Sequence, residues 1–302
     1  MPDRAREIDA PRVAGAGFAQ LGVGPMTTNW SARFASAGND AMRRDYDGIM
    51  VPRLFEPWAE VLLDQLALQP GEQVLDVACG PGTVARAAAR RIGPTGQVTG
   101  VDFSPAMLAI AQEKPPVAEG APIEYLEGPA DHLGVPDHDV DVVTCQHGLQ
   151  FFPDRPAALA DMRRVLRPGG RLGVAVWRSI AECPPFDALA DGIAEVLGNQ
   201  VATVYRGGPW VLGDADELMS LIDGAGFTDL TVARYELPLV FEGGAAQLVD
   251  TLSIAAVAAD VAALDDKGRQ DLVAAVARAA APLMDGDAVR STAAANLATA
   301  RA

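Results

Sequence analysis

A strand that runs through a glycine turn into a helix is the feature that most constrains how this chain folds. Residues Gln73–Val77 read as a buried strand, Gly80 and Gly82 follow it, and Thr83–Ile92 has the periodicity of a helix. Glycine lets backbone N–H groups come close to a bound molecule, and the N-terminus of a helix presents further N–H groups. The layout therefore predicts a ligand site at the end of a strand.

Strands and helices alternate along the chain around this turn. The expected strands are residues 73–77, 97–101, 123–126, 140–145 and 171–177, and the expected helices are 83–92, 104–114 and 156–166. Residues 140–145 are almost all apolar, as in a central parallel strand that is buried on both faces. This alternation predicts an α/β fold with a doubly wound, Rossmann-like and mostly parallel sheet.

The pattern changes after Trp177. Helices are expected at 185–197, 216–225, 245–263 and 268–281, and the last two are rich in alanine. Residues 230–233 and 237–241 have strand character, and we expect them to form an antiparallel hairpin that closes the sheet near the C-terminus.

The element pattern divides the chain into five parts. We expect a flexible arm at 1–29, an N-terminal helical cover at 30–69, the ligand-binding Rossmann-like core at 70–178, an inserted helical cap at 179–212, and a segment at 213–302 that completes the core sheet and ends in helices. The arm is set apart because it is rich in glycine, alanine and proline and has only weak periodicity.

The charge and the cysteines of the chain limit its partners. The formal net charge is −16, so the surface repels nucleic acid and anionic membranes, and we expect neither as a partner. The three cysteines have no CxxC spacing, which argues against a zinc site or a disulfide scaffold and favours a reducing compartment. No run is long and apolar enough to span a membrane. We expect a cytoplasmic protein without a metal site, and a homodimer is compatible with the sequence.

Two cofactors suit the glycine turn, a dinucleotide and S-adenosylmethionine. The run Gly80–Ala85 satisfies the dinucleotide fingerprint with alanine at its last position, and Asp102 ends the next strand, where it can accept hydrogen bonds from both ribose hydroxyls. Asp76 favours S-adenosylmethionine, because its carboxylate would repel a pyrophosphate but attract an ammonium and a sulfonium. An alternative role for Asp76 is to brace the backbone of the loop.

Other residues near the ends of the strands can contact an adenosine group. Phe103 or Met107 can lie against the purine face, although packing of its own helix explains Met107 equally well. Asp131 follows the third strand, where its side chain can meet the adenine amino group. No Tyr-x-x-x-Lys pair or comparable apparatus for hydride transfer is visible, which weakens the case for a dinucleotide.

Taken together, these motifs resemble those of class I S-adenosylmethionine-dependent methyltransferases, close to the group that contains the ubiquinone and menaquinone biosynthesis methyltransferases. The matching segments are 74–82, 100–107, 128–133, 141–143, 146–154 and 164–172, within residues 70–178. The motifs are specific as an ordered set. Ala78 and Thr83 stand where some members have glycine, and Pro129 stands where aspartate is frequent.

The resemblance implies a cofactor site for S-adenosylmethionine, with S-adenosylhomocysteine as the product. The predicted cofactor-binding residues are Gly80 and Gly82 at the methionine portion, Asp102 at the ribose, Ala130 and Asp131 at the adenine, Gln146 near the amino-acid end, Tyr46 at the carboxylate, and Asp76, Ala78, Thr83, Phe103 and Met107 along the rest of the site.

Methyl transfer from a sulfonium is a direct displacement, in which the protein mainly supplies proximity and alignment. A base is needed only when the acceptor must lose a proton. His147 follows the fourth strand, at the edge of the sheet where ligands bind, and is the candidate base. The alternative is that His147 is a hydrogen-bonded structural histidine.

Aromatic residues in the cover and the cap could roof a substrate. They are Trp30, Tyr46, Phe55, Phe186, Tyr205 and Trp210. They indicate an apolar or ring-bearing acceptor, or else a plain helical cover. The sequence thus predicts an S-adenosylmethionine-dependent enzyme that methylates O, C or N of a small molecule. The alternatives are an NAD-type oxidoreductase and a cofactor-binding cyclase of the same fold that transfers no methyl group.

Overall fold

The computed structural model describes residues 46–302 and the two-residue strand β1 (Arg6–Glu7). Most of the predicted arm at 1–29, the first part of the predicted cover at 30–69, and Trp30 lie outside the described residues. Among the described residues, no helix is both long enough and apolar enough to cross a membrane.

The described strands form one nine-stranded sheet in the order β1-β7-β9-β6-β5-β2-β3-β4, with β8 (Met284–Asp285) paired to β9. Its parallel core consists of β2 (Gln73–Val77), β3 (Gln97–Asp102), β4 (Ile123–Glu127), β5 (Val140–Gln146) and β6 (Leu166–Trp177). β9 (Ala288–Arg301) runs antiparallel to both of its neighbours, β6 and β7 (Thr228–Phe241). The predicted doubly wound, mostly parallel α/β fold is therefore confirmed.

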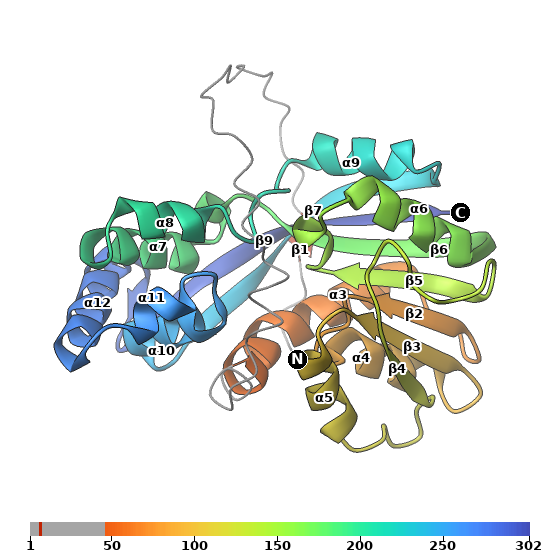
Figure 1. Ribbon diagram of the computed structural model, residues 1–302, viewed down its shortest axis with the longest axis horizontal. Coiled ribbons are helices and arrows are strands. Elements are labelled where there is room, and N and C mark those ends of the chain that lie inside the picture. The colour runs from red at the N-terminus through yellow and green to blue at the C-terminus, as the bar shows by residue number, and fades with distance from the viewer. Residues whose placement is uncertain (1–5, 8–45) are drawn as a thin grey trace.

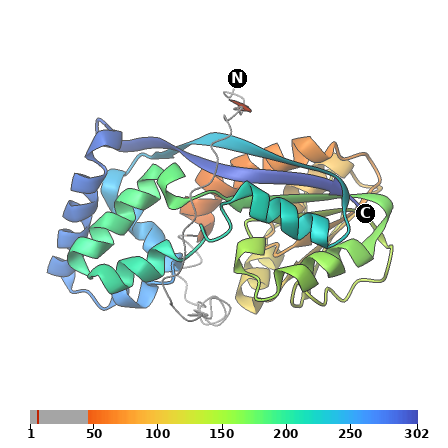
Figure 2. The same ribbon diagram turned by 90° about the horizontal axis from the view of Figure 1, so that it is seen from above.

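Helices cover both faces of the core sheet (Figure 2). α3 (Glu56–Leu66) and α4 (Thr83–Ile92) pack on one face, and α6 (Arg155–Val165) and α9 (Ala215–Gly224) pack on the other. Alternate side chains of β2 point to opposite faces of the sheet. Val74 packs with α3 and α4 on one face, whereas Leu75 and Val77 pack with α6 and α9 on the other. The apolar strand before the glycine turn is thus buried on both sides.

A second lobe lies beside the core (Figure 1). Its helices are α7 (Pro184–Val196), α8 (Asn199–Arg206), α10 (Gly244–Asp250), η4 (Thr251–Ile254), α11 (Ala258–Ala262) and α12 (Asp266–Ala279). β7 and β9 are long enough to belong to the core sheet at one end and to reach this lobe at the other. α12 packs against α7, so the lobe joins the inserted cap to helices that come much later in the chain.

The C-terminal strands differ from the predicted hairpin. Residues 228–241 form the single strand β7, and its antiparallel partner is β9, which the sequence analysis did not assign to a strand. β9 is rich in alanine, which by propensity favours helix, but its alanines are buried between β6 and β7. The tertiary setting, a place in the sheet between two strands, decides the conformation.

Most predicted helices lie within one residue of the observed ones, which holds for α4, α6, α7 and α9. The predicted helix at 245–263 is instead broken into α10, η4 and α11. The described end of the predicted N-terminal helix consists of η1 (Tyr46–Phe55), which is wound as a π-helix, and then α3. Pro52 lies inside η1 and lacks the N–H donor that a regular helix needs there.

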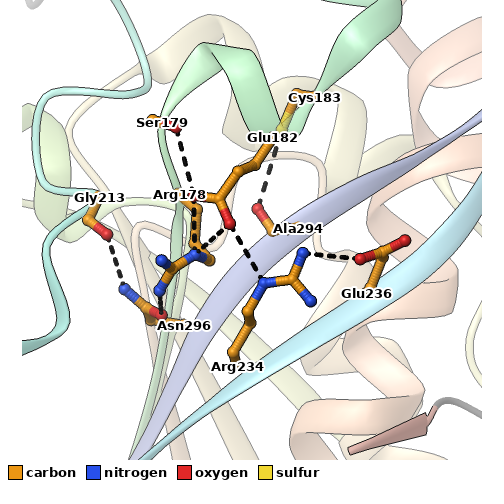
Figure 3. A network of polar contacts seen from close by, with 9 residues as sticks. All are labelled: Arg178, Ser179, Glu182, Cys183, Gly213, Arg234, Glu236, Ala294 and Asn296. Atoms are coloured by element: carbon orange, nitrogen blue, oxygen red, sulfur yellow. Dashed lines mark hydrogen bonds and ion pairs between the residues drawn. The ribbon is translucent and has the colours of Figure 1, made fainter. Parts of the chain in front are cut away.

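A network of polar side chains joins the core to the second lobe (Figure 3). Glu182 accepts hydrogen bonds from Nε of Arg178, at 2.8 Å, and from Nε of Arg234, at 3.1 Å. Arg178 also donates to Oδ1 of Asn296, at 2.7 Å, and the amide nitrogen of Asn296 donates to the Gly213 carbonyl, at 3.0 Å. Although burial pushes the pKa of Glu182 upward, the arginine hydrogen bonds hold it below its usual value. The network therefore ties β6, β7 and β9 to the start of the cap.

We predict that Asn296→Ala destabilises the protein by about 1–3 kcal/mol, because Nη1 of Arg178 and the Gly213 carbonyl each lose their partner, although Nε of Arg178 keeps Glu182. The control is Glu242→Gln, which alters an exposed ion pair with Arg290 and should change stability by less than about 1 kcal/mol. Urea unfolding measures both. Equal stabilities of the two variants would show that the network does not hold the lobes together.

Candidate functional site

A cavity of about 470 Å³ opens at the carboxyl ends of the parallel strands, between the core and the second lobe. That volume is in the range that small-molecule sites occupy. The core contributes the glycine turn, the ends of β3 and β5 and the segment after β4, and the lobe contributes Phe186, Tyr205, Pro209, Trp210, Thr251, Ile254 and Ala255. The cavity is therefore closed by segments that are far apart in the sequence.

The structure brings nearly all of the predicted site residues together. His147 lines the cavity, as do all the predicted cofactor residues except Gly82, namely Tyr46, Asp76, Ala78, Gly80, Thr83, Asp102, Phe103, Met107, Ala130, Asp131 and Gln146. Gly82 lies at the N-terminus of α4 with a φ of +79°, and a Cβ built on it would be 2.3 Å from the Tyr125 hydroxyl. It is therefore needed for the packing of the turn, and it does not face the cavity.

Asp76 ties the first turn of α4, the helix that follows the glycine turn, to the neighbouring strand β5. Its carboxylate accepts hydrogen bonds from the Ala85 N–H, at 3.0 Å, and from the Thr144 hydroxyl, at 2.8 Å. Burial raises the pKa of Asp76 to about 7, while these two hydrogen bonds oppose the shift. The bracing role considered for Asp76 is thus observed, and the carboxylate also lies at the wall of the cavity.

Asp102 holds the turn from the side. Its two carboxylate oxygens accept hydrogen bonds from the N–H groups of Gly80 and Ser104, each at 2.8 Å. Burial raises the pKa of Asp102, and the two backbone hydrogen bonds oppose that rise. A carboxylate oxygen can accept more than one hydrogen bond, so Asp102 keeps acceptor capacity toward the cavity.

Several polar atoms in the cavity wall are buried without a hydrogen-bond partner among the described residues. They are Oγ1 of Thr83, Oε1 of Gln146 and both ring nitrogens of His147. The side-chain nitrogen of Gln146 donates to the Phe55 carbonyl, at 2.9 Å, which leaves its oxygen as a fixed acceptor. Buried polar groups normally have partners, so these atoms indicate a polar ligand. An unpartnered acceptor in a cavity that is also lined by Asp76 and Asp102 fits the ammonium of S-adenosylmethionine.

His147 is held by aromatic rings. Its imidazole stacks on Trp177 with ring centroids 3.7 Å apart and planes 4° apart, and the edge of Trp58 meets it at 5.9 Å. Burial lowers the pKa of His147 to about 3, so the ring is neutral at physiological pH. The alternative of a hydrogen-bonded structural histidine does not describe this side chain, because neither ring nitrogen has a partner among the described residues.

The charged side chains of the cavity wall are all carboxylates. They are Asp76, Asp102, Asp131 and Asp154, and the described wall contains no lysine or arginine. A wall of this kind attracts cations and repels anions.

Sequence reasoning identified most of the aromatic roof and missed part of it. Tyr46, Phe55, Phe186, Tyr205 and Trp210 line the cavity as expected. Phe151 and Phe152 were quoted only as part of a motif. Thr251 and Ile254 of η4, and Ala255 directly after it, were not considered for the site. No local signal marks η4, because its place depends on how the lobe folds back.

Solved structures with this architecture define the class of the fold. The chain is similar to a proposed methyltransferase from Bacillus halodurans C-125, with a TM-score of 0.53, 22% identity, and coverage of 80% of this chain and 97% of that one. It is also similar to phosphoethanolamine N-methyltransferase 2 of Haemonchus contortus, solved with phosphomonomethylethanolamine and S-adenosylhomocysteine, with a TM-score of 0.56, 17% identity, and coverage of 90% and 60%. The fold is that of the Rossmann-like methyltransferases.

Sequence relatives narrow this class. The ubiE/COQ5 methyltransferase family matches residues 39–240. A demethylmenaquinone methyltransferase of Listeria welshimeri is 32% identical over 190 residues, which cover 58% of this chain and 78% of the relative. One from Lysinibacillus sphaericus is 30% identical over 222 residues, which cover 69% and 91%. The chain belongs to the ubiE/COQ5 methyltransferase family. It is an S-adenosylmethionine-dependent methyltransferase, as predicted, and the oxidoreductase alternative is not favoured.

We predict that the affinity for S-adenosylmethionine rises as the pH increases through about 7, because a cationic ligand favours the ionised form of Asp76, whose pKa is raised to about 7. Binding near pH 7 should then release protons. Asp76→Asn should make the affinity nearly independent of pH, whereas Asp131→Asn, on the exposed part of the wall, should leave the dependence intact. Calorimetry in buffers of different ionisation enthalpy measures both quantities. A flat profile in the unaltered protein would contradict the role of Asp76.

Proposed function

We propose that this methyltransferase acts on a small, neutral acceptor with a hydroxylated ring, such as a quinol or a phenol, and that His147 is the base that removes the hydroxyl proton. The observation that carries this proposal is the buried imidazole with two unpartnered nitrogens at the aromatic part of the cavity. The relatives named demethylmenaquinone methyltransferases support a quinone-type ring.

The proposed cofactor site follows the residues of the glycine turn. In this assignment Asp102 holds the ribose hydroxyls, Gly80 lies along the methionine portion, and Oε1 of Gln146 accepts from the ammonium. The free acceptor capacity of Asp102 and the unpartnered oxygen of Gln146 support these roles.

The other end of the assigned cofactor site lies at the carboxyl ends of β3 and β4. Ala130 and Asp131 frame the adenine, and the exposed ring of Phe103 lies against it, with Met107 beneath. Tyr46 is assigned to the carboxylate, and Ala78 and Thr83 complete the wall of the turn. All of these residues line the same cavity, which supports the assignment.

When bound, S-adenosylmethionine supplies an electrophilic methyl group on a sulfonium. The residues of the chain bind the acceptor and remove its proton. Burial lowers the pKa of His147 to about 3, so the imidazole is neutral at physiological pH but is a weak base before the acceptor binds. The proposal therefore requires that the bound acceptor raise this pKa toward the operating pH. Removal of the hydroxyl proton raises the electron density of the acceptor ring, which makes its oxygen or a ring carbon nucleophilic. Trp177, whose face lies on the imidazole, stabilises the positive charge that develops there.

The charge of the cavity wall disfavours an anionic acceptor. Four carboxylates and no described cation face the cavity, so a phosphate or a carboxylate on the acceptor would be repelled. The apolar rings of Trp177, Phe186 and Trp210 instead provide surfaces on which a planar ring can pack. An acceptor that is neutral, planar and hydroxylated meets both conditions.

We predict that His147→Ala lowers kcat by roughly 10²–10⁴-fold, the usual contribution of a positioned base, while affinity for S-adenosylhomocysteine changes little. Turnover is measured with a methyl-labelled donor on hydroxylated rings and on the same rings with hydrogen in place of hydroxyl. Only the hydroxylated rings should accept methyl. The matched control is His132→Ala, which alters an exposed histidine outside the cavity wall. Equal turnover of both ring types, or full activity of His147→Ala, would refute the proposal.

Some expectations from the sequence remain predictions. These are the homodimer, the lack of nucleic-acid and membrane partners, the cytoplasmic location, and the division of the chain into five parts. The cyclase alternative, like the oxidoreductase one, is not favoured, because the chain belongs to the ubiE/COQ5 methyltransferase family.

A further inference from the structure

The segment α10–η4–α11 lies beyond the residues that the family model matches, which end at 240. It belongs to the second lobe, and its central turn, η4, packs against η1 at the edge of the core (Figure 1). Thr251, Ile254 and Ala255 of this segment line the same cavity as the glycine turn. The lobe therefore reaches over the proposed cofactor site as well as the proposed acceptor site.

Ile254 is the side chain of η4 that contacts the wall of the proposed cofactor site. Met107 and Ile110 of α5 (Pro105–Glu113) form a small buried apolar cluster, and both Ile254 and Tyr46 pack against it. Met107 and Tyr46 are also residues of the proposed cofactor site, and the Tyr46 hydroxyl is 3.9 Å from the position of a Cβ built on Gly80. Ile254 thus lies against the wall of the cofactor site that faces the glycine turn.

The contact between η4 and α5 is of a kind that can open and close. The cluster that joins η4 to α5 is apolar, and apolar contacts are not directional, so they can separate and re-form without stranding a hydrogen bond between the two elements. Within its own segment, η4 is fixed by the Thr251 hydroxyl, which donates to the Leu248 carbonyl at 2.7 Å. The turn can therefore keep its shape while its contact with α5 opens.

We propose that η4 is a gate across the cofactor site and that Ile254 is its latch, which must leave the Met107 cluster before the cofactor enters or the product leaves. This inference rests on the proposed cofactor site. Closure of the gate would shield the reacting groups from water, as covering segments do in many enzymes.

The test is stopped-flow measurement of S-adenosylhomocysteine binding and release, followed by the fluorescence of Trp177 and Trp210, which line the cavity. We expect Ile254→Ala to raise the release rate about tenfold and to raise the association rate as well, because truncation of the latch favours the open state. Ile254→Val keeps most of the apolar contact and should fall between Ile254→Ala and the unaltered protein.

The matched control is Leu264→Ala, which truncates a half-buried side chain of the same lobe that does not line the cavity. It should leave both rates unchanged even if it lowers stability. Unchanged release from Ile254→Ala would overturn the proposal, and so would faster release with unchanged association, since a fixed wall behaves in that way. Failure of the unaltered protein to bind S-adenosylhomocysteine would instead refute the cofactor site itself.

Discussion

Two buried carboxylates shape the glycine turn, and the rest of the site depends on them. Asp76 ties the first turn of α4 to β5, and Asp102 ties Gly80 to the end of β3. Both carboxylates accept hydrogen bonds from backbone N–H or hydroxyl groups, which fixes the ends of the turn beside the cavity. Their charges also make the cavity attractive to a cation and unattractive to a pyrophosphate. The structural role and the choice of cofactor thus come from the same two side chains.

The second lobe closes the side of the cavity that the core does not cover. The network of Arg178, Glu182, Arg234 and Asn296 fixes the lobe at the point where β7 and β9 leave the core (Figure 3). The lobe closes the cavity with aromatic and aliphatic side chains, whereas the neutral imidazole of His147 is packed among Phe55, Trp58 and Trp177 of the core side. In the proposed mechanism the lobe provides the surface for a planar ring and encloses the cofactor through η4.

The core and its turn could be predicted from sequence because their signals are local. An apolar strand, a glycine turn and an acid at the end of the next strand lie within about thirty residues, and parallel strands bring their ends to one edge. β9 could not be predicted, because alanine carries no strand signal and its place depends on β6 and β7. Gly82 does not line the cavity, and the reason is visible only in three dimensions, since a Cβ built on it would meet the Tyr125 hydroxyl.

In the proposed site the turn held by Asp102 binds the methyl donor, and calorimetry with S-adenosylhomocysteine tests this assignment most directly. Asp102→Asn keeps the size of the side chain, but it removes the charge and replaces one of the two oxygens that accept from Gly80 and Ser104, so the ribose also loses an acceptor. We expect at least about tenfold weaker binding, equivalent to about 1.4 kcal/mol, with a cooperatively folded protein. Equal affinity of the variant and the unaltered chain would contradict this account of the site.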